Sequence, residues 1–429
     1  MKRVMINKLN NYINESIKLQ GWVYRIRKLK SITFLIVRDR TGLVQCVIGN
    51  KALEECSLRV ESVITIVGIV KEGKNSLNSF EVQVESLEVI NSTNVELPIE
   101  VNTETLNINL DTMLNNRVLS LRHEKVNSIF KVQNLIVQGF REFLLGEDFT
   151  EIFTPKIVSE GAEGGTEIFE VKYFENKAYL AQSPQFYKQM MVGAGFERVF
   201  EVAHVYRAEQ HNTNRHLNEY VSMDFEMGFI ENEEEIMSME ENLLKFILEK
   251  VETEGDKYIR ILDTKIPKID DFIPRIKFSE AIEILKNEYG KIGLEGDLDP
   301  EGEKLICNYV KEKYGSEFVF LTHYPRRKRP MYTMPCGEEE TYSFDLLFRG
   351  IEITTGGQRI HEYEELVKNM EYKGLNADNY KSYTCIFKYG MPKHGGLAIG
   401  LERITAQLLG LENVREASLI PRDRTRLRP

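Results

Sequence analysis

The sequence lacks the features that mark membrane, secreted or zinc-binding proteins. No apolar run approaches the roughly 18 residues that a membrane-spanning helix needs, and the polar N-terminal stretch has no hydrophobic signal-peptide core. The five cysteines are odd in number without close pairs, and the seven histidines show no HxxH or HExxH spacing. We therefore expect a cytoplasmic protein with reduced thiols, no membrane association and no zinc site.

Two common nucleotide-binding signatures are also missing. Neither GxxxxGK[ST] nor GxGxxG in a strand–helix–strand setting occurs in the chain. Both signatures place glycine-rich backbone around phosphates. Any nucleotide must therefore be held by another arrangement.

Charge is unevenly distributed along the 429 residues. The net charge is −10, which taken alone argues against a nucleic-acid partner. Residues 1–95, however, contain 14 Lys and Arg against 9 Asp and Glu, a balance of +5 that leaves −15 for the remainder. A short basic cluster comprises Arg25, Arg27, Lys28, Lys30, Arg38 and Arg40. Such a local basic face is typical of a nucleic-acid-binding module, although a charged strand edge would look the same.

Residues 1–95 are predicted to form a small barrel. Short alternating runs separated by turn signals predict five strands, at 17–25, 33–38, 43–48, 62–70 and 79–90. Five such strands favour an OB-type barrel, which binds single-stranded nucleic acid by stacking bases on aromatic side chains. We expect Phe34 to stack on a base, with Gln45 and Arg25 bonding to its neighbours. A Phe34 packed in the barrel core is the alternative.

Residues 96–122 are predicted to be a linker and 123–429 a second domain. Apolar residues from Val126 to Leu144 recur on one helical face, so a helix from His123 to about Gly146 is expected. A strand ending at Pro155 should follow. Long hairpins at 200–229 and 342–360 predict a mainly antiparallel sheet flanked by helices, and so an α+β fold.

The 200–229 hairpin carries the first candidate chemistry. Arg207 ends one strand, a polar loop follows, and His216, Tyr220 and Asp224 recur every four residues into the next strand. Arginine suits phosphate because its planar fork donates two parallel hydrogen bonds. A phosphate beside a stacked base could be held here, although an ordinary solvated hairpin is equally compatible.

The 342–360 hairpin carries two carboxylates. A turn at Arg349–Gly350 would set 348 opposite 351, 347 opposite 352 and 345 opposite 354, so Asp345 and Glu352 should share a face. Adjacent carboxylates repel unless a cation lies between them, and Mg2+ bridged to nucleotide phosphates would serve. A pair neutralised by a basic side chain such as Arg349 is the alternative.

A glycine-rich segment, KHGGLAIGLERITAQ, precedes the last predicted helix. Gly395, Gly396 and Gly400 would let the backbone approach another group closely. Arg403 follows at a strand-to-helix junction, a combination that suits a triphosphate.

These stretches, with YLAQSPQFYKQ, resemble the motifs of class II aminoacyl-tRNA synthetases, most closely aspartyl-tRNA synthetases of the archaeal and eukaryotic type. The helix from His123 with the strand to Pro155 resembles motif 1, VYRAE through RHLNEYVSMD motif 2, and GLAIGLER motif 3. The resemblance runs from GWVYRIRKLKSITFLIVRDRTGLVQ to the ending LIPRDRTRLRP. It implies that ATP activates L-aspartate to aspartyl-adenylate with Mg2+ as cofactor, and that tRNA-Asp then accepts the aspartyl group.

The resemblance implies roles for individual residues. Arg207 would hold the α-phosphate, Arg403 the γ-phosphate, and Tyr220 would stack on adenine, with Glu352 also catalytic. Mg2+ would be carried by Asp345 and Glu352. ATP would be contacted by Arg207, Glu209, His216, Leu217, Tyr220, Glu352, Gly400 and Arg403. Aspartate would be held by Glu163, Gln185, Lys188 and Arg359, while Ala162 replaces the Ser or Thr of many relatives.

The resemblance leaves alternatives open. An asparaginyl-tRNA synthetase shares the fold, although Lys188 and the ending PRDRTRLRP favour the aspartyl enzyme. A tRNA-binding paralogue without catalysis would be expected to have lost some of Arg207, Asp345, Glu352 and Arg403. Charging of tRNA-Asn as well as tRNA-Asp stays open, and would depend on Tyr24 and the loop 71–80. A homodimer is expected because the apolar face from Val126 to Leu144 is more hydrophobic than one core needs.

Overall fold

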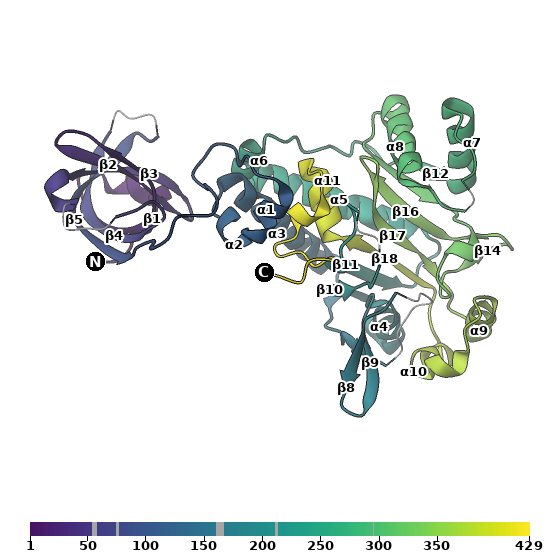
Figure 1. Cartoon of the computed structure of the whole chain (residues 1–429). Helices are drawn as coiled ribbons and strands as arrows, with labels where there is room; N and C mark the ends of the chain where they lie inside the picture. The colour runs from purple at the N-terminus through teal and green to yellow at the C-terminus, as the bar shows by residue number, and fades with distance from the viewer. Residues whose placement is uncertain (54–57, 74–76, 160–166, 211–212, 295) are drawn as a thin grey trace. The chain divides into compact units, whose positions relative to one another are not determined.

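A computed structural model describes residues 1–53, 58–73, 77–159, 167–210, 213–294 and 296–429. The chain divides into two units, Met1–Ile108 and Asn109–Pro429 (Figure 1). Across the described ranges, no helix has both the length and the apolar character needed to cross a membrane.

The first unit is a closed barrel with the strand order β1-β2-β3-β5-β4. All neighbouring strands pair antiparallel except β3 and β5, which are parallel. The strands are β1 (Ser16–Lys28), β2 (Ile32–Asp39), β3 (Gly42–Gly49), β4 (Val63–Glu72) and β5 (Phe80–Asn91). The predicted five-stranded OB-type barrel is confirmed.

The alternation along β2 decides where Phe34 lies. Leu35 and its alternate neighbour Val37 are fully buried in the barrel core, whereas Phe34 is only partly buried on the opposite face of the strand. Arg25 pairs with Ile36, which pairs with Gln45 in turn. Since paired residues share a face, Arg25 and Gln45 lie on the same outer face as Phe34.

The second unit is built on an eight-stranded sheet with the order β12-β13-β16-β17-β18-β11-β10-β6. Only the two outermost pairings, β12 with β13 and β10 with β6, are parallel, so the predicted mainly antiparallel sheet is confirmed. Its strands are β6 (Thr150–Glu151), β10 (Arg198–Tyr206), β11 (Glu219–Gly228), β12 (Arg275–Lys277), β13 (Phe318–Thr322), β16 (Ser343–Phe348), β17 (Ile351–Arg359) and β18 (His394–Gly400).

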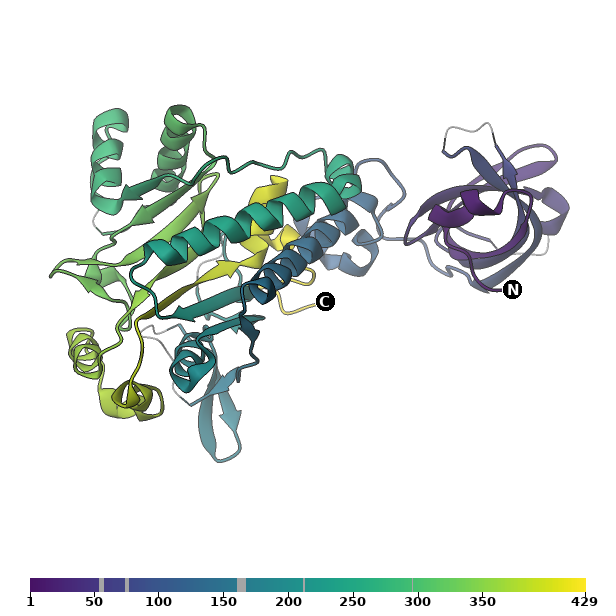
Figure 2. The ribbon, with the colours of Figure 1, turned by 180° about the vertical axis from the view of Figure 1, so that it is seen from behind.

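Helices and two small sheets complete the second unit. The long helices α3 and α5 lie side by side across one face of the large sheet (Figure 2). The helices are α1 (Leu110–Asn115), α2 (Arg117–Ser120), α3 (Glu124–Gly146), α4 (Gln185–Met191), α5 (Glu234–Glu254), α6 (Asp256–Leu262), α7 (Phe278–Tyr289), α8 (Pro300–Tyr314), α9 (Tyr363–Tyr372), α10 (Lys381–Thr384) and α11 (Leu401–Leu409). The small sheets contain β7 (Ile157–Val158), β8 (Glu170–Tyr173) and β9 (Asn176–Leu180), and β14 (Pro335–Cys336) with β15 (Glu340–Thr341).

The helix predicted from His123 is present as α3, but its apolar face has a different role from the one expected. Val132, Ile136 and Phe140 are fully buried in the core of the same unit, together with residues of α5 and the sheet. The hydrophobicity of this face is therefore explained without a second chain, and the argument for a dimer from this face was wrong.

The strand predicted to end at Pro155 is shorter than expected. The β6 strand stops at Glu151, and Ile152 makes one further backbone bond to Phe200. Beyond it the backbone is held by a side chain, since the Thr154 N–H and hydroxyl both donate to Glu201, at 2.8 and 2.7 Å. Pro155 has no N–H to donate to a sheet.

Candidate active site

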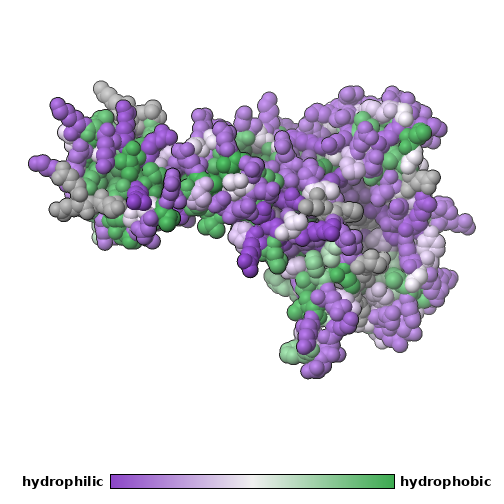
Figure 3. All heavy atoms as spheres, in the orientation of Figure 1, coloured by the Kyte–Doolittle hydropathy of each residue, from purple (hydrophilic) through white to green (hydrophobic). Residues whose placement is uncertain are grey.

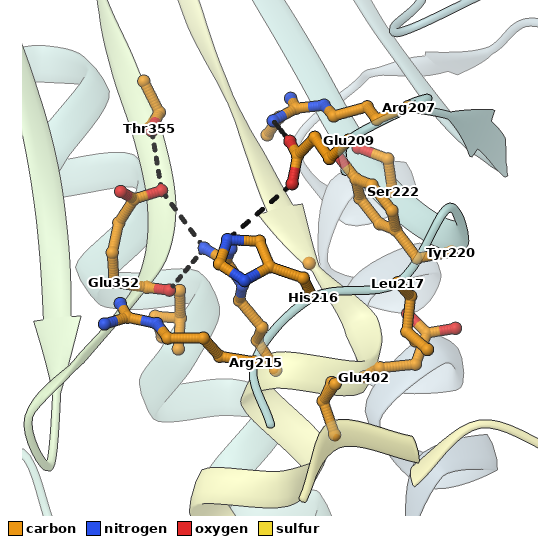
Figure 4. Close-up of a pocket in the computed structure, with 15 residues that line it drawn as sticks. Arg207, Glu209, Arg215, His216, Leu217, Tyr220, Ser222, Glu352, Thr355 and Glu402 are labelled. Atoms are coloured by element: carbon orange, nitrogen blue, oxygen red, sulfur yellow. Dashed lines mark hydrogen bonds and ion pairs between the residues drawn. The ribbon is translucent and has the colours of Figure 1, made fainter. Parts of the chain in front are cut away.

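A pocket of about 670 Å3, partly open to solvent, lies over β11, β17, β18 and the start of α11 (Figure 4). It is lined by Arg207, Glu209, Arg215, His216, Leu217, Tyr220, Ser222, Glu352, Ile353, Thr355, Ala398, Gly400, Glu402, Arg403 and Val414. All eight residues that the sequence predicts to contact ATP are among them. Segments as far apart in the chain as Arg207 and Val414 thus meet at one cavity.

Glu209 organises one wall of the pocket. Its carboxylate oxygens lie 3.8 Å from the Arg207 guanidinium and 3.7 Å from Nε2 of His216 (Figure 4). The guanidinium carbon of Arg207 is also 5.6 Å from the centre of the Tyr220 ring. With 45% of its side chain exposed, Arg207 is oriented by these neighbours but accessible to a ligand.

The opposite wall combines a cation, a carboxylate and a hydroxyl. Arg403 donates to the backbone oxygen of Glu352 at 3.1 Å and lies 3.5 Å from its Oε1. The Thr355 hydroxyl donates to the same Oε1 at 3.1 Å (Figure 4). Arg207, in the loop after β10, and Arg403, on α11, therefore enter one pocket from different elements, as two phosphate-binding groups would require.

A bulge changes the predicted register between β16 and β17. Phe348 pairs with Ile351 and Leu347 with Glu352, as predicted, but the register then shifts and Asp345 pairs with Thr355 instead of Thr354. The extra residue, Ile353, sits in the bulge. Asp345 still faces the Glu352 side, because Thr355 lies opposite Asp345 and bonds to Glu352.

Arg329, and not Arg349, neutralises Asp345. The Arg329 guanidinium donates to Oδ2 of Asp345 at 2.7 Å, whereas Arg349 points away and pairs with Glu317 at 2.7 Å. Burial raises the pKa of Asp345 to about 6; Arg329 opposes this, and nearby Glu352 adds to it. The ionised carboxylate therefore needs more positive charge than Arg329 supplies.

The Asp345 carboxylate suits a hard cation. Its Oδ1 is buried and accepts no hydrogen bond of normal geometry from the described residues, although the Thr355 hydroxyl favours its ionised form. Glu352 offers a second, more accessible carboxylate. No cluster of three or more His, Cys, Asp or Glu able to hold a metal occurs within the described ranges. Mg2+ is commonly bound through one or two carboxylates with water and phosphate as its other ligands, and these two carboxylates fit that pattern.

Three of the four residues predicted to hold aspartate, Gln185, Lys188 and Arg359, form a second, buried cluster beside the pocket. The Lys188 ammonium on α4 lies 3.1 Å from Asp224 and 3.3 Å from Glu226, both on β11. Arg359 on β17 donates to Glu226 at 2.9 Å and to Gln185 at 3.3 Å. The cluster and the pocket are linked, since Ser222 lines the pocket and its hydroxyl donates to Asp224.

Glu226 is the centre of this cluster. It is fully buried, and although burial opposes its ionisation, Arg359 and Lys188 hold its pKa below the usual value. A Cβ at position 396 would lie 2.3 Å from its carboxylate, so the site admits only glycine there. Gly395 similarly approaches Ile236. The close approach expected at these two glycines is therefore to Glu226 and Ile236, whereas Gly400 is the one of the three that lines the pocket.

Several residues that line the pocket were not predicted from the sequence. Arg215 stands in the quoted loop and Thr355 in the quoted hairpin, so both were within reach of the motif argument. Glu402 is buried, accepts from the Val221 N–H with both oxygens, at 3.2 and 3.1 Å, and has a pKa raised to about 8 by burial. No sequence signal marks such a contact to the backbone. Glu163 and Ala162 lie outside the described residues.

Comparison with known proteins identifies similar chains over the full length. Residues 109–424 match the family "tRNA synthetases class II (D, K and N)", and residues 17–90 match the "OB-fold nucleic acid binding domain". An aspartate--tRNA(Asp/Asn) ligase of Thermus thermophilus is 49% identical over 428 residues, with 100% of each chain covered. An aspartate--tRNA(Asp) ligase of Pyrococcus furiosus is 42% identical, covering 99% of this chain and 98% of the relative.

The fold has an equally complete counterpart among solved structures. The asparaginyl-tRNA synthetase of Pyrococcus horikoshii, complexed with asparaginyl-adenylate, superposes with a TM-score of 0.92 at 30% identity. The match covers 100% of both chains. The architecture is therefore common to chains whose names specify different amino acids, and side chains must make the distinction.

Proposed function

Because the chain belongs to the class II tRNA synthetases of the D, K and N group, we propose that it is an aspartate–tRNA ligase. It would activate L-aspartate with ATP, release diphosphate, and transfer the aspartyl group to the 3′ end of tRNA-Asp. The observation that carries this proposal is the meeting of Arg207, Tyr220, Glu352 and Arg403 at one pocket, beside the buried cluster that contains Lys188 and Arg359.

The first step would be an in-line displacement at the α-phosphorus by the aspartate carboxylate. Arg207 would bind the α-phosphate, Arg403 the γ-phosphate, and Tyr220 would stack on adenine. Bound Mg2+ would neutralise phosphate charge, held by Asp345 and Glu352. Preorganised charge and positioning then supply the rate enhancement, so no side chain need act as a covalent nucleophile.

Preference for aspartate over asparagine would rest on Lys188 and Arg359. Both are buried, where an amide in place of a carboxylate would leave a cation poorly compensated. Asp224 and Glu226 pair with these cations in the absence of substrate, so the substrate carboxylate would have to take over part of these contacts when it binds. Gln185, which donates to Glu226 over 3.5 Å, would orient the substrate from α4, and Glu163 would hold its amino group.

We propose that the barrel, with the 1–95 boundary predicted from sequence, binds the anticodon through Arg25, Phe34 and Gln45. Exposed arginine beside a half-exposed aromatic supports this assignment. We further propose that tRNA-Asn is charged as well as tRNA-Asp, because the 49% identical relative is named for both. Charging purified tRNA-Asn and tRNA-Asp transcripts side by side tests this, and charging of tRNA-Asp alone would reject it.

We propose a homodimer on grounds other than the α3 face. Phe153, between β6 and β7, and Ile157 on β7 are 83% and 52% exposed, and Leu145 at the end of α3 is 56% exposed, on a side of that helix away from the core. Burying these side chains in a second copy would be favourable. The visible face of the second unit is mostly hydrophilic, with hydrophobic side chains gathered near β8–β9 and in smaller patches elsewhere (Figure 3). Full activity at a solution mass near the 49.8 kDa of one chain would refute the dimer.

The direct test is exchange of labelled diphosphate into ATP with aspartate, with asparagine and with neither. Exchange that requires aspartate is the expected result. Exchange supported by asparagine would make the chain an asparaginyl enzyme, and no exchange with either would indicate a tRNA-binding paralogue. The reaction needs no tRNA, so it tests the catalytic unit independently of the barrel.

A further inference from the structure

The C-terminal segment Pro421–Pro429 lies against the loop that joins β10 to β11 (Figure 1). We propose that this segment is a positioning element of the ATP pocket, which holds residues 207–210 and 213–219 of that loop in the shape that places their side chains there. The inference rests on the proposed function for the identity of the nucleotide. No residue of Pro421–Pro429 is among those that the sequence predicts to contact ATP.

The segment forms hydrogen bonds with the loop both where the loop leaves β10 and where it returns to β11. On the returning arm, the Asn218 N–H donates to the Arg422 oxygen at 2.9 Å, and Glu219 and Arg422 form an antiparallel bridge. On the outgoing arm, the Arg424 guanidinium donates to the Gln210 oxygen at 2.9 Å. The residues between these points include His216 and Leu217, which line the pocket.

The chain just before the segment adds a third attachment. The Val414 N–H donates to the Asn214 oxygen at 2.9 Å, and the Asn214 side chain donates to the Glu412 oxygen at 3.2 Å. Val414 is itself a pocket residue. The C-terminal region therefore contacts the beginning, middle and end of the described part of the loop.

The segment can transmit this restraint because its own shape is fixed. Asp423 accepts from the N–H groups of Thr425 and Arg426, at 2.8 and 2.9 Å, and pairs with Arg415 at 2.7 Å. Backbone hydrogen bonds and the Arg415 pair offset the burial of Asp423 and lower its pKa. Arg426 then donates to Asn115 on α1 at 2.7 Å. The segment is thus tied to the body of the unit at both ends.

The consequence should be specific to ATP. A loop that is not held would have to be ordered by the nucleotide, and ordering even about one residue costs on the order of a tenfold loss in affinity. The aspartate cluster is held instead by α4, β11, β17 and β18. Weakening the segment should therefore raise KM for ATP and leave KM for aspartate almost unchanged.

The test uses full-chain point variants and a chain that ends at Ile420. Arg424→Ala should raise KM for ATP in diphosphate exchange by roughly threefold to tenfold, the effect of losing one hydrogen bond of ordinary net strength at an exposed position. Asp423→Ala should act similarly, and Asp423→Asn should restore part of the effect because an amide oxygen can still accept from Thr425 and Arg426. Arg428→Ala, at an exposed position of the same segment, is the matched control.

The KM values for ATP and aspartate, together with Tm, either support or overturn the proposal. A rise in KM for ATP without one for aspartate, at nearly constant Tm, supports the proposal. An unchanged KM for ATP, or equal rises for both substrates with a lowered Tm, overturns it. If the shortened chain does not fold, the point variants still decide. Calorimetric binding of Mg-ATP to each variant makes the test independent of aspartate, so failure of the proposed function and failure of this inference can be told apart.

Discussion

The Arg329 guanidinium donates to Oδ2 of Asp345 over 2.7 Å, with both side chains nearly buried. The pair stands next to the pocket and brings a single positive charge to a region where Glu352 adds a second negative one. Arg403 lies 3.5 Å from the Glu352 carboxylate, so the feature that suits a divalent cation is the pair of neighbouring carboxylates and not an excess of negative charge. The consequences can be measured through pH and Mg2+.

Diphosphate exchange should fall as pH falls through about 6, the pKa that burial gives Asp345. Below that value the carboxyl is protonated and neutral, so it cannot help to hold Mg2+. Because cation and proton compete for the same oxygens, more Mg2+ should move the midpoint to lower pH. Exchange profiles at two Mg2+ concentrations check this. A midpoint that does not shift with Mg2+ concentration, or that is still present in Asp345→Asn, would contradict the assignment of this pH dependence to Asp345.

Replacing Lys188 with Leu should raise KM for aspartate sharply while KM for ATP stays nearly constant. The lysine is buried against Asp224 and Glu226, so its loss should also destabilise the protein by about 3–5 kcal/mol, the usual effect of leaving a buried charge unpaired. Exchange kinetics and melting should be recorded together. Unchanged kinetics with aspartate would show that this cluster does not bind the substrate.

Glu240 on α5 should make stability fall at high pH. It is fully buried, and burial raises its pKa from 4.5 to about 8. The folded state therefore favours the protonated form, so its contribution is complete below the unfolded value and is lost as pH rises through about 8. Glu240→Gln should melt higher than the wild type above that pH and close to it near pH 5, whereas exposed Glu249→Gln should track the wild type at all pH values. Equal pH dependence in the two variants would contradict this.

Sequence patterns predicted where helices and strands lie along the chain better than they predicted what those elements contact in the folded protein. The barrel strands and α3 were predicted correctly because alternation and helical periodicity are local properties. The apolar stripe of α3 could not show whether it faced its own core or another chain. The two residue pairs next to the β16–β17 turn were predicted correctly, but the bulge at Ile353 was not, since alternation along a strand does not show where an extra residue enters the pairing. Arg349 was the obvious neighbour for Asp345 in sequence, yet Arg329 reaches it from another segment.

The site was predicted mainly through resemblance to known motifs. From spacing alone, Arg207 could equally have belonged to a solvated surface hairpin, and Glu352 to a carboxylate pair neutralised by a basic side chain. Matching both residues to the motifs of a family favoured the functional interpretation. Family membership and the class II fold are confirmed by the comparisons. Glu226 was not found because its partners, Lys188 and Arg359, come from α4 and β17 and meet only in the folded chain. The individual roles of the site residues stay predictions.

The outer face of the barrel gives a prediction with an internal control. Phe34→Ala should weaken tRNA charging by roughly one to two orders of magnitude, because stacking on a base contributes about 1–3 kcal/mol. Diphosphate exchange needs no tRNA and should stay near wild type. Since Phe34 is only partly buried on the outside of β2, its loss should lower Tm little.

Leu35→Ala, one residue away and fully buried in the barrel core, is the matched control. It should leave a cavity and destabilise the barrel by about 2–5 kcal/mol, with charging reduced only in proportion to the folded fraction. Charging and Tm measured on both variants separate base stacking from packing. If Phe34→Ala lowered Tm as much as Leu35→Ala does, or left charging intact, stacking on the anticodon would be rejected.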